Sequence, residues 1–190
     1  MIDSCVKIYV LPGGKMPERK TDGAIGFDVF LRAVVSPSEM DPNNPVLRKT
    51  IFDFSRMPSD DPTLERRVID RGGELTYEMD PGESILVGIG FVTEMEFPMF
   101  YWVAPRSGLA SKHGITVTNA PGTVDPDYRG EAGVIVKNNN SSRFYLKKDM
   151  RIAQIIFQKA IIPNIEEVKN YRKLSTTKRG VGGFGSTGVK

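Results

Sequence analysis

At residues 74–95 the chain reads "ELTYEMDPGESILVGIGFVTEM". Two runs rich in β-branched and aromatic residues flank the segment DPGE at 80–83. Glycine accepts the positive φ that a tight hairpin requires, so this segment is typical of a turn. We therefore expect strands over 74–79 and 84–95, joined by that turn.

Similar short runs, broken by glycine and proline, recur along the rest of the chain. A second turn is predicted at "NNNSS", 138–142, because asparagine also accepts positive φ. Many short strands at regular spacing favour an all-β sandwich or closed barrel. The further strands that we expect cover residues 6–11, 27–35, 100–105, 114–119, 131–138, 143–148 and 151–162.

The segment 36–72 differs from its surroundings because it is polar, contains prolines and mixes both charges. We interpret it as an insertion between two strands rather than as part of the core. Its "SPSEM" at 36–40 resembles a helix start. A second short helix is expected in "DDPTLERRVID", 60–70. The tail from about residue 170 shows neither helical nor strand periodicity and should be mobile unless a partner orders it.

Composition narrows the class of protein. The 190 residues suffice for one domain with a core, and both charges are mixed along the chain at a net charge of +3. That balance disfavours a nucleic-acid surface and fits a basic pocket for a small polyanion. The chain has one cysteine, Cys5, which disfavours an internal disulfide. With one cysteine and one histidine, His113, a zinc site is also disfavoured, because such sites need several ligands of these types. Without a signal-like or membrane-spanning run, we expect a cytoplasmic protein.

The segment "APRSGLASKHGI", 104–115, is the first candidate for chemistry. Arg106, Ser107 and Gly108 follow a strand and open a helical turn. A guanidinium, a hydroxyl and free backbone N–H groups there can cradle phosphate. The alternative is an ordinary strand-to-helix turn with Ser107 as the N-cap.

A second candidate is "NAPGTVDPDYRGE", 119–131. A buried carboxylate at Asp125 or Asp127 could act as a general base toward water. The Tyr128 ring could form one wall of a site for a flat or sugar-like ligand. The alternative is a β-hairpin turn, which this segment taken alone favours.

Weaker candidates lie on two predicted strands. Asp28 could face a hydrated Mg²⁺ ion or be a surface residue. Arg151 and Gln154 are polar in an apolar run and therefore need partners, either structural or in a ligand.

The tail carries a glycine-rich segment, "RGVGGFGSTG", at 179–188. Such segments cradle phosphates because their N–H groups approach closely, although a lone glycine-rich tail is usually a linker. Arg179, Phe184, Ser186 and Thr187 would serve little purpose in a mere linker.

Five of these segments stand in the order of the five motifs of the trimeric dUTPases. They are AIGFDV (24–29), PRSGLA (105–110), GTVDPDYRG (122–130), RIAQII (151–156) and RGVGGFGSTG (179–188). The chain resembles that family from about residue 6 to 188, apart from the insertion 36–72. The resemblance implies a distorted β jelly roll over 1–170, a C-terminal lid over 171–190, and a homotrimer with shared active sites.

The resemblance also implies a reaction. dUTP and water give dUMP and pyrophosphate with Mg²⁺, which keeps uracil out of DNA and supplies dUMP for dTMP synthesis. Asp125 would be the general base, Tyr128 would lie against the deoxyribose and exclude a 2′-hydroxyl, and Asn119 would read uracil. Asp28 would hold water molecules of the Mg²⁺ ion.

The remaining motif residues would bind the nucleotide. Arg106, Ser107 and Gly108 would hold phosphate oxygens, with Gln154 nearby. In the tail, Arg179 would clamp the γ-phosphate and Phe184 would stack on uracil. Further phosphate contacts would come from Gly185, Ser186 and Thr187.

Three positions depart from the family pattern. Ile25 stands where a small residue is usual. Asp149 and Met150 replace a glycine and an acid before Arg151, which leaves open both a turn and the charge partner of Arg151.

Two other functions remain as alternatives. A dCTP deaminase of this superfamily would need a glutamate in the strand after the third motif, but residues 132–138 contain no acid. A regulatory protein could instead bind a protein partner through the insertion 36–72.

Overall fold

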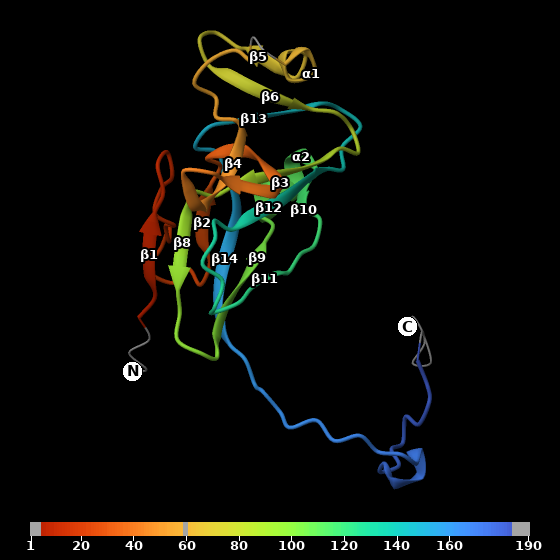
Figure 1. The fold of residues 1–190 in the computed structure, drawn as a ribbon. Helices are drawn as coiled ribbons and strands as arrows, with labels where there is room; N and C mark the ends of the chain where they lie inside the picture. The colour runs from red at the N-terminus through yellow and green to blue at the C-terminus, as the bar shows by residue number, and fades with distance from the viewer. Residues whose placement is uncertain (1–4, 59–60, 184–190) are drawn as a thin grey trace. The chain divides into compact units, whose positions relative to one another are not determined.

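The structure is a computed structural model that describes residues 5–58 and 61–183. The chain divides into two compact units, residues 1–160 and 161–190. The first unit holds every strand of the described residues (Figure 1). The described residues of the second unit, 161–183, contain one short 3-10 helix, η1 (Tyr171–Lys173). The expected division at 170/171 stays a prediction.

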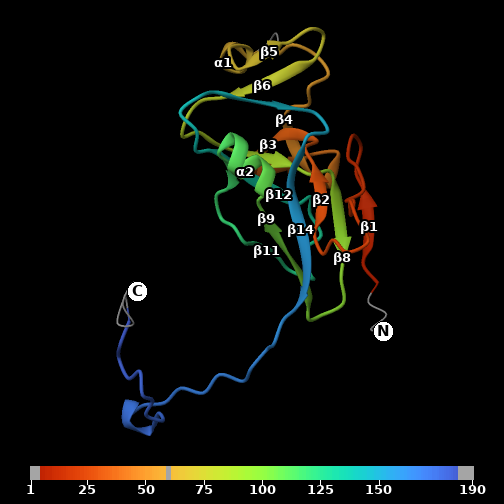
Figure 2. The ribbon, with the colours of Figure 1, turned by 180° about the vertical axis from the view of Figure 1, so that it is seen from behind.

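The strands of the first unit form four antiparallel sheets (Figures 1 and 2). The five-stranded sheet has the order β10 (Ile115–Val117), β12 (Gly133–Asn138), β7 (Ser84–Gly88), β3 (Ala33–Asp41), β4 (Asn44–Phe52). The four-stranded sheet has the order β11 (Gly122–Val124), β9 (Met99–Ala104), β14 (Arg151–Lys159), β2 (Phe27–Phe30).

Two smaller sheets and two helices complete the unit. β13 (Phe144–Lys147), β6 (Leu75–Met79) and β5 (Val68–Asp70) form one sheet, and β1 (Lys7–Val10) pairs with β8 (Phe91–Glu94). The helices are α1 (Pro62–Glu65) and α2 (Ser107–His113). In the described residues no helix is long and apolar enough to cross a membrane.

One hydrophobic core joins these sheets. In β12, Val134, Val136 and Asn138 are buried and the residues between them are partly accessible. Period-two alternation of this kind places one face of a strand against the core. The largest fully buried side chains include Tyr101, Phe91, Leu31, Met79 and Ile155. The all-β expectation is confirmed.

Two predicted strands are divided in the structure. The run 84–95 forms β7 and β8, separated at Ile89 and Gly90, and Gly90 has a φ of 73°. A Cβ at Gly14 would overlap the Gly90 carbonyl oxygen, so the backbone there packs too closely for a side chain. The run 27–35 likewise divides into β2 and the start of β3.

The helix expected at "SPSEM" is wrong, because these residues belong to β3. The Ser36 hydroxyl does accept a hydrogen bond from the Glu39 amide at 3.2 Å, the contact of a helix N-cap. It does so within an irregular stretch of the β3–β4 ladder, where the register shifts between Val35 and Met40. Pro37 lies in this stretch and cannot donate to a regular ladder. The expected helix in 60–70 is confirmed only as α1, which β5 follows.

The interpretation of 36–72 as lying outside the core is also wrong. Phe52, Phe54 and Val68 are buried and belong to the main hydrophobic cluster. The β3–β4 hairpin extends the five-stranded sheet at its edge, and it is buried at the start of β3 and at Phe52, the last residue of β4. The insertion is therefore part of the folded unit that carries the candidate site.

Candidate active site

One sheet brings three of the five motifs together. Strand β14 pairs with β2 on one side and with β9 on the other, and Gln154 is in register with both Asp28 and Ala104. The chain leaves β9 at Ala104, and Arg106 follows two residues later and Ser107 three. The first, second and fourth motifs thus meet at one end of the four-stranded sheet, where they line a pocket of about 450 Å³.

Ion pairs organise this first pocket. The Asp28 carboxylate accepts hydrogen bonds from Arg106 Nε at 2.8 Å and from Arg106 Nη2 at 3.3 Å. Arg151 Nη1 donates to the same carboxylate at 3.0 Å. The bidentate contact fixes the plane of the Arg106 guanidinium. Lys20 adds a third cation to the lining, so cations outnumber carboxylates there.

The departures from the family pattern find their explanation here. Asp149 adopts a φ of 63°, a conformation in which glycine is usual and aspartate is tolerated. Asp28 is the charge partner of Arg151. The Ile25 side chain is 74% exposed, so it changes no packing in the core.

Gln154 and the two residues after Arg106 shape the pocket. Gln154 Nε2 donates to the Pro105 carbonyl at 3.0 Å, which ties β14 to the turn before α2. A Cβ at Gly26 would overlap Gln154 Oε1, so a side chain at position 26 would displace the Gln154 amide. Ser107 is the first residue of α2, and the N-cap position belongs to Arg106 without a side-chain cap; the alternative with Ser107 as N-cap is wrong. A Cβ at Gly108 would meet nothing within 4 Å.

The third motif lies apart from this pocket. Asp125 follows β11 and is exposed, as is Asp127, so the expectation of a buried carboxylate is wrong. With Phe97, Asp127 and Arg129, Asp125 lines a second pocket of about 480 Å³. The Tyr128 amide donates to the Asp125 carbonyl at 3.3 Å, which closes a turn between the two residues.

Tyr128 is half-buried and its hydroxyl has two partners. It donates to the Glu131 carbonyl at 3.1 Å and lies 3.3 Å from the donor Nη2 of Arg48. A Cβ at Gly130 would come within 2.5 Å of the hydroxyl oxygen. Behind this motif, burial raises the pKa of the Tyr101 phenol well above its usual value, so that ring stays neutral.

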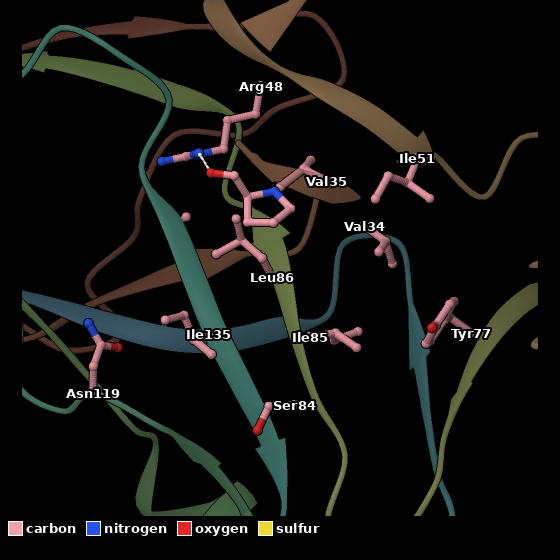
Figure 3. A pocket seen from close by; sticks show the side chains of 12 residues that line it. Val34, Val35, Arg48, Ile51, Tyr77, Ser84, Ile85, Leu86, Asn119 and Ile135 are labelled. Atoms are coloured by element: carbon pink, nitrogen blue, oxygen red, sulfur yellow. Dashed lines mark hydrogen bonds between the residues drawn. The ribbon is translucent and has the colours of Figure 1, made fainter. Parts of the chain in front are cut away.

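Asn119 is exposed and lines a third pocket, of about 630 Å³, between the five-stranded sheet and the start of the third motif. Figure 3 shows Asn119 at the lower left, the apolar side chains of Ile85, Leu86 and Ile135 in the middle, and Arg48 at the top. The residues predicted to bind one nucleotide therefore line three different pockets of this chain.

The fifth motif is described only in part. In the second unit, Arg179 is exposed and its Nε donates to the Gly182 carbonyl at 2.8 Å. Phe184, Gly185, Ser186 and Thr187 lie outside the described residues.

Sequence reasoning missed the residues that support the third motif. Arg32 and Glu131 form a buried bidentate ion pair, with Arg32 Nε 2.7 Å from Oε1 and Nη2 2.9 Å from Oε2. Arg48 contacts both Glu131 and Tyr128. Arg32 and Glu131 were charges within predicted strands, and Arg48 lay in the polar segment 36–72; neither feature reveals a partner.

Comparison with known proteins agrees with this architecture. A family model described as dUTPase matches residues 74–188. The deoxyuridine 5′-triphosphate nucleotidohydrolase of Heliobacterium modesticaldum is 36% identical over 178 residues, 94% of this chain and 92% of that protein. The enzyme of the same name from Nautilia profundicola is 51% identical over 108 residues, 57% of this chain and 74% of that protein.

Solved structures share the fold. A point mutant of the dUTPase of Staphylococcus bacteriophage 80alpha, solved with dUpNHpp, superimposes with a TM-score of 0.66 at 18% identity, covering 97% of this chain and 99% of the other. The dUTPase of phage phi11 of S. aureus gives a TM-score of 0.60 at 14% identity, covering 90% and 99%.

The chain belongs to the dUTPase family. It is a dUTP diphosphatase by class, since the family hydrolyses dUTP to dUMP and pyrophosphate. The resemblance read from the five motifs is confirmed, and the deaminase alternative is set aside.

Proposed function

We propose that this chain hydrolyses dUTP by Mg²⁺-assisted attack of an Asp125-activated water on the α-phosphorus. The observation that carries the proposal is the first pocket, where three motifs converge around Arg106 and Arg151. A triphosphate brings several negative charges, and cations outnumber carboxylates in the lining. Arg106, Ser107, Gly108 and Gln154 would bind its oxygens.

The third motif would supply the chemistry and the selection of the sugar and base. Asp125 would take the proton of the attacking water, Tyr128 would lie against C2′ of the deoxyribose, and Asn119 would hydrogen-bond uracil. Such a carboxylate needs a water within hydrogen-bond reach of both itself and the phosphorus. The exposed position of Asp125 leaves room for that water.

The residues of the first pocket fit a Mg²⁺ ion that is held through its water molecules rather than by direct protein ligands. In the described residues no cluster of three or more histidine, cysteine, aspartate or glutamate side chains could hold a metal directly. Mg²⁺ commonly keeps several waters and is carried by substrate phosphates with one carboxylate nearby. Asp28 would contact these waters once phosphate oxygens have drawn Arg106 and Arg151 away from it. The ion would offset charge that builds on the phosphate oxygens.

We further propose a homotrimer with shared sites. Within one chain the phosphate, catalytic and uracil residues line three different pockets. A neighbouring copy that brings its second and third pockets to the first would complete a site. The segment 171–190 would then close over the nucleotide through Arg179, Phe184, Gly185, Ser186 and Thr187.

Fewer observations support the remaining proposals. A cytoplasmic location without a nucleic-acid partner stays a prediction. A protein partner at 36–72 also stays a prediction. Because Phe52, Phe54 and Val68 of this segment are buried in the core, deleting the segment would unfold the protein rather than test such a partner.

The test is pyrophosphate release from dUTP, dCTP, dTTP and UTP by the wild type and Asp125→Asn. We expect dUTP to be strongly preferred. Asp125→Asn should bind dUTP within a few-fold of wild type and lose about 10²–10⁴-fold in kcat, the range of a general base. Asp127→Asn is the matched control and should retain most activity. Near-normal kcat in Asp125→Asn would exclude Asp125 as the base.

A further inference from the structure

The inserted hairpin β3–β4 is joined to the third motif by a set of hydrogen bonds. The Glu131 amide donates to the Val46 carbonyl at 2.7 Å, and the Arg48 amide donates to Glu131 Oε2 at 3.1 Å. Arg32 Nη1 donates to the Thr50 hydroxyl at 3.0 Å. The segment 46–50 therefore lies alongside the end of the third motif. Its Arg48 amide and the Arg32 side chain both contact the buried carboxylate of Glu131.

The Arg48 side chain extends this contact to the ring of the motif. Its Nε donates to the Glu131 carbonyl at 3.0 Å and its Nη2 donates to the Tyr128 hydroxyl at 3.3 Å. The Tyr128 hydroxyl in turn donates to the same carbonyl. These three groups form a closed triangle of hydrogen bonds, and a planar guanidinium with two donors fits its two acceptors.

The rest of the chain holds Arg48 in this position. Its Nη1 lies 3.4 Å from the Pro37 carbonyl on the facing strand (Figure 3). On the opposite side, a Cβ at Gly133 would come within 3.3 Å of Arg48 Nε, so the side chain passes close over β12. A side chain at position 130 would collide with the Tyr128 hydroxyl, so the glycine there leaves space for the ring in this position.

We propose that Arg48, a residue of the insertion, positions the Tyr128 ring and thereby sets how strongly the enzyme rejects a 2′-hydroxyl. The inference rests on the proposed role of Tyr128 at the deoxyribose. Arg48 would not touch the nucleotide and would act only through the Tyr128 hydroxyl. Without it the hydroxyl keeps the Glu131 carbonyl as its one partner among the described residues, and the ring gains freedom to admit a ribose.

The test compares kcat/KM for UTP and dUTP in Arg48→Met. Methionine keeps an unbranched stem among the apolar residues of the third pocket and removes every donor. The backbone bond from residue 48 to Glu131 is retained, so the hairpin stays anchored. We expect the UTP/dUTP ratio of kcat/KM to rise about tenfold, the loss of one charged hydrogen bond.

Lys49→Met is the matched control. It removes a cation from the neighbouring position of β4, where Lys49 pairs with Glu39 on the surface. It should leave the ratio unchanged. Arg48→Lys keeps the charge, but one ammonium group does not reproduce the two-donor fork, so only part of the selectivity should return.

The same ratio is then measured in a Tyr128→Phe background. This comparison distinguishes an effect through the Tyr128 hydroxyl from a merely structural role of Arg48. Tyr128→Phe alone should raise the ratio, and adding Arg48→Met should then change it less than twofold, because the hydroxyl through which Arg48 acts is gone. Equal effects of Arg48→Met in both backgrounds, or an unchanged ratio in the wild-type background, would overturn the inference. If Arg48→Met does not fold, Tyr128→Phe with a wild-type ratio would overturn it equally.

The wild-type protein separates this inference from the proposed function. A wild type without preference for dUTP over UTP removes the role of Tyr128 and this inference with it. A wild type that prefers dUTP, with an unchanged ratio in Arg48→Met, overturns only the part played by Arg48.

Discussion

The Glu131 carboxylate is the most heavily used acceptor near the third motif. It accepts four hydrogen bonds, from Arg32 Nε and Nη2 and from the amides of Arg48 and Gly90. Its side chain is fully buried and that of Arg32 is 6% exposed. A buried charge of this kind is tolerated only when it is paired and fully hydrogen-bonded.

Replacing Glu131 with glutamine should therefore destabilise the fold strongly. The guanidinium of Arg32 would remain buried without a countercharge, and the amide nitrogen of glutamine would face donors. We expect a loss of about 3–5 kcal/mol in the free energy of unfolding, measured by urea denaturation. Glu94→Gln, which breaks the exposed pair with Lys7, should leave the urea midpoint near that of wild type. A similar midpoint for Glu131→Gln would contradict this account.

Pairings of this kind could not be predicted from the sequence. Arg32 and Glu131 are 99 positions apart, and neither stands in a pattern that names its partner. The motif residues Arg106 and Gln154 were found because their chemistry is local, in a short run of fixed spacing. Their contacts with Asp28 and Pro105 depend on strand pairing, which single residues do not specify.

Among the secondary structure elements, the β3–β4 hairpin shows how local propensity misleads. Ser36, Pro37 and Glu39 form a helix-start pattern, and Ser36 even makes the capping hydrogen bond. Pairing with β4 and the burial of Phe52 prevail over that local preference. By contrast, the strands around DPGE were predictable, because alternation and turn chemistry agree there.

For the C-terminal segment, residues 171–190, the sequence and the structure contribute different information. Its motif is specific in sequence, and the second unit is described by itself as far as residue 183. Truncation after Tyr171 should leave a folded protein, since the hydrophobic core lies within the first unit. We expect kcat/KM for dUTP to fall by about 10²-fold or more, because groups that orient and enclose the nucleotide are removed.

Removal of only Val189 and Lys190, which follow the fifth motif, is the control for that truncation. It should leave kcat/KM unchanged. Circular dichroism and thermal unfolding would verify that both truncated proteins fold. Full kcat/KM after truncation at Tyr171 would show that the segment is dispensable.

For the whole molecule, the separation of the site residues among three pockets is the main observation. The resemblance to the family implied shared sites, but the motifs themselves did not show which of Asp28, Arg106, Gln154 and Asp125 one chain keeps apart. The reason is that motif order along a chain carries no information about which copy faces which. An assembly with shared sites therefore has to be tested by mixing chains.

Mixing two inactive variants provides that test. Arg106→Gln disables the first pocket and Asp125→Asn disables the second, so each homogeneous protein should be inactive. If a site takes its first pocket from one chain and Asp125 from a neighbour, unfolding and refolding an equal mixture should restore roughly one quarter of the wild-type rate, because each intact half is present with probability one half. A mass measurement in solution should give three chains. If each chain instead completes its own site, the refolded mixture stays as inactive as the two variants alone, and the shared-site arrangement is excluded.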